Sequence, residues 1–97
     1  MQDPELIRLD PADTVAVCRR AVSAGERVRF DGGELTAVEH VPQGHKVALR
    51  AHEAGDQVLK YGRPIGVATV AVAIGEHVHV HNLASVRGRR RAGPVAP

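Results

Sequence analysis

The sequence predicts an all-β domain built from short strands and tight turns. Its apolar residues are mainly valine and alanine, and Phe30 and Tyr61 are the only aromatic residues. Small branched side chains favour strands over helices. Ten glycines and six prolines divide the chain into short apolar segments. Many short segments separated by glycine turns are typical of an all-β fold.

The first segments of the chain show where a strand and a helix compete. A short strand is predicted at residues 6–9, and we expect it to end at Asp10 and Pro11. Residues 13–25 are ambiguous, because Asp13 is a suitable N-cap and Gly25 a suitable C-terminal residue for a helix. Residues 14–17, however, alternate and are rich in β-branched side chains, which indicates a strand.

An internal repeat decides between these two interpretations. A shift of thirty residues aligns Val17, Arg20, Ala21, Ala24, Gly25 and Val28 with Val47, Arg50, Ala51, Ala54, Gly55 and Val58. The second copy begins directly after the turn residues 42–44, so it leaves little room for a helix. A strand followed by a glycine turn therefore fits both copies, and residues 73–78 give a third, weaker copy of the turn.

The remaining strands follow from the same pattern of apolar alternation and turn residues. Residues 31–33 (Asp-Gly-Gly) predict a hairpin turn, and residues 61–64 predict another turn. We expect strands at residues 27–30, 35–41, 46–49, 57–61, 65–68 and 77–81, with residues 69–74 left unassigned.

Length, charge and cysteine content restrict the class of protein. The 97 residues suit one domain, at residues 1–86, followed by a basic tail at residues 87–97 that we expect to be disordered. Without the four arginines of the tail, nine basic residues face eleven acidic ones, so no nucleic-acid partner is expected. Cys18 is the only cysteine, and the chain has no apolar segment long enough for a signal peptide or a membrane span. We expect a cytoplasmic protein without a membrane partner.

Three histidines at alternate positions form the most distinctive motif. On a strand, His77, His79 and His81 would line one face, with neighbouring histidines about 7 Å apart at Cα. Neutral imidazoles in this arrangement suit a metal or an anionic substrate oxygen. The alternative is a solvated edge strand that carries the histidines on its wet face.

Three segments in order resemble a known family. They are residues 44–49 (GHKVAL), 61–69 (YGRPIGVAT) and 75–83 (GEHVHVHNL). Together they resemble the N-terminal SAF domain of the altronate and galactarate dehydratases, which has a β-clip fold. The alpha subunit of sulfolactate sulfo-lyase is also similar. The resemblance implies a cytoplasmic lyase that acts on sugar acids and depends on a divalent metal, iron or manganese.

The resemblance also implies which residues form the site. His45, His79 and His81 are the expected catalytic residues, and His79 and His81 the expected metal ligands, with the remaining ligands supplied by a partner subunit. Lys46, Tyr61 and Asn82 are the expected substrate-binding residues. His77 is expected to be solvated, as are His40 and His52, and a core position is an equally good interpretation for Tyr61.

These residues do not form a complete catalytic set. We therefore expect a small subunit or N-terminal domain that is inactive alone, completed by a large catalytic dehydratase subunit and acting on an anionic sugar acid. The alternative is a non-catalytic β module that binds a carbohydrate, a sugar acid or a metal. The sequence leaves a homo-oligomer open, and it leaves open whether the chain is a free subunit or a part of a longer protein.

Overall fold

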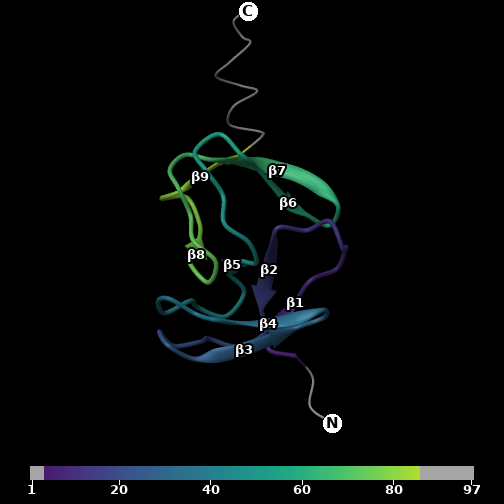
Figure 1. The fold of residues 1–97 in the computed structure, drawn as a ribbon, viewed down its shortest axis with the longest axis vertical. Helices are drawn as coiled ribbons and strands as arrows, with labels where there is room; N and C mark the ends of the chain where they lie inside the picture. Colours follow the sequence, from purple (N-terminus) through teal and green to yellow (C-terminus); the bar gives the residue numbers. More distant parts are fainter. Residues whose placement is uncertain (1–3, 86–97) are drawn as a thin grey trace, which may run out of the picture.

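The computed structural model describes residues 4–85, and within this range it has strands and turns but no helix (Figure 1). The strands are β1 (Leu6–Ile7), β2 (Val15–Cys18), β3 (Arg27–Phe30), β4 (Gly33–Thr36), β5 (Lys46–Ala48), β6 (Gln57–Lys60), β7 (Arg63–Ala68), β8 (His77–Val78) and β9 (Leu83–Ser85). The prediction of an all-β fold is confirmed.

The strands form three antiparallel layers. The central sheet has the order β1-β2-β5-β8, and it lies between the hairpin β3–β4 and the sheet β6-β7-β9 (Figure 1). The middle strands β2 and β5 are therefore covered on both faces. This explains why residues 14–18 are apolar almost throughout, since a strand that is covered on both faces needs apolar side chains on both.

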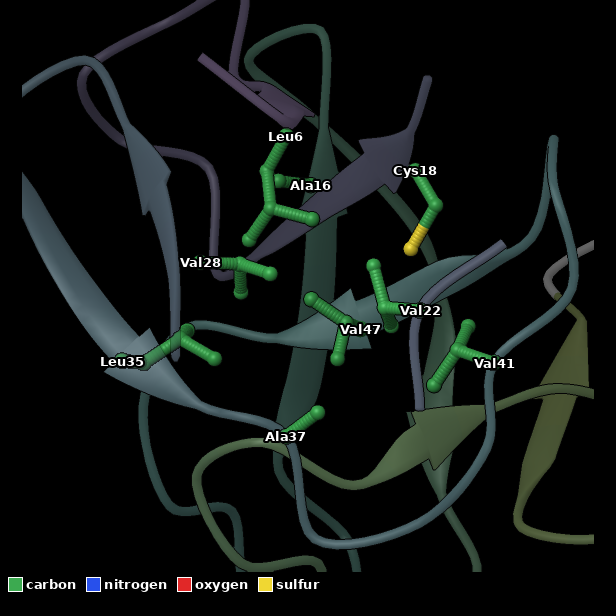
Figure 2. Packing of buried hydrophobic residues seen from close by; sticks show 9 residues of the cluster. All are labelled: Leu6, Ala16, Cys18, Val22, Val28, Leu35, Ala37, Val41 and Val47. Atoms are coloured by element: carbon green, nitrogen blue, oxygen red, sulfur yellow. The ribbon is translucent and has the colours of Figure 1, made fainter. Parts of the chain in front are cut away.

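Each face of the central sheet packs against its own hydrophobic core. Along β5, Val47 belongs to the cluster beneath β3–β4, and Ala48 belongs to the cluster beneath β6–β7. Along β2, Ala16 and Val15 divide in the same way, as the alternation of a strand requires. Figure 2 shows the first cluster, in which the side chains of Leu6, Ala16, Cys18, Val22, Val28, Leu35, Ala37, Val41 and Val47 converge.

One turn recurs four times and ties the layers together. It spans residues 23–26, 42–45, 53–56 and 73–76, and in each copy the N–H of the fourth residue donates to the carbonyl of the first at 2.9–3.1 Å. The third residue is a glycine with positive φ in every copy: Gly25, Gly44, Gly55 and Gly75. The glycine N–H and the fourth carbonyl then bond one small buried residue: Ala37, Cys18, Ala68 and Ala48 respectively. The thirty-residue sequence repeat corresponds to this turn.

Several expected boundaries are wrong. The strand expected at residues 35–41 ends at Thr36, and the strand expected at residues 77–81 ends at Val78. A strand at Leu83–Ser85 was not expected. His52 was expected at the surface but is buried, with Nε2 2.8 Å from the Thr14 hydroxyl. His52 pairs with Val72 in an isolated antiparallel bridge. Val22, thirty residues earlier in the sequence repeat, pairs with Val41 in the same way.

The predicted tail at residues 87–97 lies outside the described residues. Among residues 4–85, no helix is long and apolar enough to cross a membrane.

Candidate functional site

The pairing of β5 with β8 brings His45 to the histidine motif. Lys46 pairs with Val78, and Val47 pairs with His77. One further step along this antiparallel ladder places His45 opposite His79, and the pleat puts His45, His77 and His79 on the same side. The pairing of β5 with β8 thus brings together three imidazoles from segments that lie 32 residues apart in the sequence.

The three imidazoles form one compact group, which we call the histidine cluster. The ring centroid of His45 lies 4.5 Å from that of His79 and 5.0 Å from that of His77. His45 Nδ1 and His77 Nε2 are within hydrogen-bond distance, at 2.8 Å. One ring nitrogen from each histidine lies within 4.8 Å of the others, and all three side chains are half-buried. The cluster therefore has the donor atoms and the spacing of a site for one metal ion or one substrate group.

A departure from the repeated turn directs His45 into the cluster. In the other three copies, the fourth residue is acidic, and its carboxylate accepts the N–H of the first turn residue: Glu26 from Ser23, Asp56 from Glu53 and Glu76 from Ala73. The copy at residues 42–45 begins with Pro42, which has no N–H to satisfy. The side chain of His45 is therefore not needed inside its own turn and bonds His77 instead.

A second turn holds His77 and His79 in position. Residues 79–82 form a turn in which the N–H of Asn82 donates to the His79 carbonyl at 3.1 Å. The buried amide of Asn82 accepts the His79 N–H at 2.9 Å through Oδ1, and it donates to the His77 carbonyl at 2.9 Å through Nδ2. Both ends of the Asn82 amide are thus bonded to backbone, which makes this residue a positioning group for the cluster.

The electrostatics around His77 and His79 favour neutral imidazoles. Partial burial lowers the pKa of His77, the neighbouring histidines lower it further, and the Glu39 carboxylate opposes this effect. Partial burial likewise lowers the pKa of His79, with contributions from His45 and from the Lys46 cation. Neutral imidazoles have the free lone pairs that metal binding and proton abstraction both require.

The structure places the other expected site residues differently. His81 is exposed beyond the end of β8, with its ring centroid 5.4 Å from that of His77, and it is not part of the cluster. Lys46 is half-buried on β5, and burial together with the Lys60 cation lowers its pKa. Tyr61 is 54% exposed at the β6–β7 turn, so the core interpretation is wrong for this residue. This turn and β8 lie on opposite sides of the view in Figure 1.

Two residues, one in the cluster and one next to it, were not expected to contribute to the site. His77 was expected to be solvated, but it is half-buried and touches all three other histidines of the region. Glu39 accepts the backbone N–H of His77 through Oε2 at 3.1 Å. The sequence does carry a signal for His77, because it alternates with His79. Glu39 has no such signal, since it lies in an irregular segment whose approach to β8 depends on the tertiary fold.

Within residues 4–85, the all-β layers and the histidine cluster define a small domain with a candidate polar site. A family model for the altronate/galactarate dehydratase SAF domain matches residues 4–86. The chain therefore belongs to this family, and the resemblance seen in the sequence is confirmed.

Several curated proteins are similar to this chain. It is 38% identical to altronate dehydratase of Bacillus subtilis (strain 168) over 76 residues, which cover 78% of this chain and 15% of the relative. It is 40% identical to altronate dehydratase of Escherichia coli (strain K12) over 78 residues, which cover 80% of this chain and 16% of the relative. It is 49% identical to (2R)-sulfolactate sulfo-lyase subunit alpha of Paracoccus pantotrophus over 53 residues, which cover 55% of this chain and 79% of the relative. The chain thus spans about a sixth of the dehydratases and most of the alpha subunit.

Proposed function

We propose that this chain is the small subunit or N-terminal domain of a metal-dependent sugar-acid lyase, of the altronate or galactarate dehydratase type or the sulfolactate type. The histidine cluster is the observation that carries the proposal, because it gathers three imidazoles from two distant segments at one half-buried position. Family membership supports this class of reaction. The rest of the site comes from a large catalytic chain.

The elimination requires two proton transfers. A base removes the proton from the carbon next to the carboxylate, the C–H electrons form the double bond, and the hydroxyl leaves as water after it accepts a proton. Imidazoles with lowered pKa values, as in His77 and His79, are neutral near pH 7 and can accept the first proton. His45 is hydrogen-bonded to His77 and can share or return a proton within the cluster.

The charged parts of the substrate need a cation. The Lys46 cation contributes to the lowered pKa of His79, and its ammonium is our candidate for binding the substrate carboxylate. Tyr61 lies on another turn, so its proposed contact with substrate depends on the large chain. Asn82 acts through His77 and His79, whose backbone it bonds, rather than through the substrate.

A divalent metal, iron or manganese, forms part of the proposal. The imidazole donors of the histidine cluster fit such an ion, since imidazole is a common ligand of first-row metals. When bound, the metal would act as a Lewis acid for the departing hydroxyl. His81, at its exposed position next to His77, stays a candidate for a catalytic contact with the substrate rather than for the metal.

The large partner is supported by the lengths of the relatives. The matched dehydratases are more than six times as long as the matched segment, and the similar sulfo-lyase chain is named as a subunit. We infer that the turnover site lies between this module and such a chain, in the cytoplasm, and that the module is inactive alone.

Co-expression with a large dehydratase chain from the same genome tests this proposal. We expect a stable complex that eliminates water or sulfite from a sugar acid or sulfolactate, whereas this chain alone gives no turnover. His79→Ala should lower kcat/KM by about 100-fold or more while the complex still forms. His40→Ala, at an exposed histidine outside the cluster, is the matched control and should retain full turnover.

Two results would count against the proposal. A complex whose turnover is unchanged by His45→Ala, His77→Ala and His79→Ala would leave the module with a binding role only. Turnover by the isolated chain would remove the need for a large partner.

A further inference from the structure

We propose that His45, His77 and His79 bind one divalent first-row metal ion within this chain, without ligands from a partner. The inference concerns the same side chains as the proposed function and deepens it, but it does not depend on turnover. His79 and His81 were expected from the sequence as the metal ligands. The proposed ligands are instead three histidines from two segments of the chain, one from the turn before β5 and two from β8 and the residue after it.

The donor atoms already lie near the required separation. Ligand nitrogens at about 2.0–2.1 Å from a metal ion lie about 3 Å from one another. The His45 Nδ1 to His77 Nε2 distance is 2.8 Å, and all three donors are within 4.8 Å. The third nitrogen needs to move by less than about 2 Å to reach the same spacing, because all three donor atoms already lie within 4.8 Å of one another.

The backbone that carries the three ligands is fixed by hydrogen bonds. The carbonyl of His45 accepts the Cys18 N–H at 2.9 Å, which anchors the turn to β2. His77 lies on β8, and its N–H donates to the Glu39 carboxylate. Asn82 bonds both His77 and His79. Ligands held in this way lose little freedom when they bind an ion, which favours affinity.

The nature of the ligand set indicates the type of ion. Three imidazole ligands suit zinc, iron, cobalt or nickel, whereas magnesium and calcium prefer oxygen ligands. Three protein ligands also leave at least one coordination position for water or substrate, as in catalytic zinc sites. His81 is exposed and lies outside the group of three, so we expect it to be dispensable for binding.

Titration of the full 97-residue chain with Zn²⁺ and Co²⁺ tests the inference. We expect one ion per chain by calorimetry, a visible Co²⁺ absorption band, and a rise in Tm of about 10 °C at a Zn²⁺ concentration 100 times Kd. His45→Ala, His77→Ala and His79→Ala should each weaken binding by about 10-fold or more, whereas His81→Ala and His40→Ala should bind like the wild type. Circular dichroism checks the fold, and His45→Gln replaces His45→Ala if the smaller side chain prevents folding.

The inference is overturned if the wild-type chain binds no ion stoichiometrically. It is also overturned if His81→Ala abolishes binding while His45→Ala does not. Because metal binding is measured without a partner or substrate, its outcome is separate from that of the turnover experiment. A chain that binds Zn²⁺ but whose histidine variants leave the turnover of the complex unchanged would retain this inference and lose the proposed function.

Discussion

The turn at residues 42–45 and the turn at residues 73–76 share one backbone design but serve different purposes. In each, the third residue is a glycine with positive φ, and the glycine N–H and the fourth carbonyl bond a buried residue of a neighbouring strand. Glu76 uses its carboxylate to satisfy the N–H of Ala73, so its side chain stabilises its own turn. Pro42 removes that requirement, and His45 is available to His77. The fourth side chain of the turn can thus contact a neighbouring segment where its own turn does not need it.

Exchange of the turn type should have the largest effect. The double variant Pro42→Ala/His45→Glu gives this turn the acidic fourth residue of the other three copies. The carboxylate introduced at position 45 would accept the backbone N–H introduced at position 42. We expect the free energy of unfolding to change by less than about 1 kcal/mol, while kcat/KM of the proposed lyase complex falls by about 100-fold or more. Urea unfolding and steady-state kinetics measure the two effects. Asp56→His, in an equivalent turn away from the cluster, should leave turnover unchanged, and a fully active double variant would show that His45 has no role.

Two turn glycines should differ in their tolerance of alanine. A Cβ at Gly44 would have no atom within 4 Å, whereas one at Gly75 would lie 2.2 Å from the Thr36 carbonyl oxygen. Both glycines have positive φ, which costs an alanine about 1–2 kcal/mol. We expect Gly44→Ala to cost about that amount and Gly75→Ala about 3 kcal/mol or more, because overpacking against backbone adds to it. Urea melts of both variants compare them, and equal costs would contradict the close approach of residues 73–76 to β4.

His52 and Val22 occupy equivalent buried positions in the thirty-residue repeat, and each forms an isolated bridge. Only His52 can bind a proton, so only its contribution to stability should depend on pH. Burial lowers the pKa of His52 below its ordinary value of 6.5, so the unfolded state binds more protons below that pH. Stability should therefore fall as the pH drops through 6.5 and level off below the folded-state pKa. His52→Val should cost about 1 kcal/mol at pH 8, through lost volume, and make the acid-dependent loss shallower. An unchanged pH dependence between pH 8 and 5 would contradict this assignment.

The sequence predicted the local elements well and the tertiary pairings poorly. Alternation correctly placed the side chains of His77 and His79 together, although the strand ends between them, and the repeated glycine phrase correctly predicted the turns. The end of β8 was missed because Asn82 bonds back to His79 and closes a turn, a contact that competes with the strand. The partnership of His45 with this motif depends on the β5–β8 register, and no local pattern reveals a pairing between segments thirty residues apart. His52 was misplaced for the same reason, since its hydroxyl partner Thr14 is 38 residues away in sequence.

Nitrogen NMR of the histidine side chains tests the central claim most directly. At pH 8 and low temperature, a chain with ¹⁵N-labelled histidines should show a scalar coupling between His45 Nδ1 and His77 Nε2 across their 2.8 Å hydrogen bond. The coupling should disappear in His45→Ala and persist in His81→Ala. The claim is contradicted if this coupling is absent and the ¹⁵N chemical shifts of His77 do not change in His45→Ala. In that case the two segments do not build a common site.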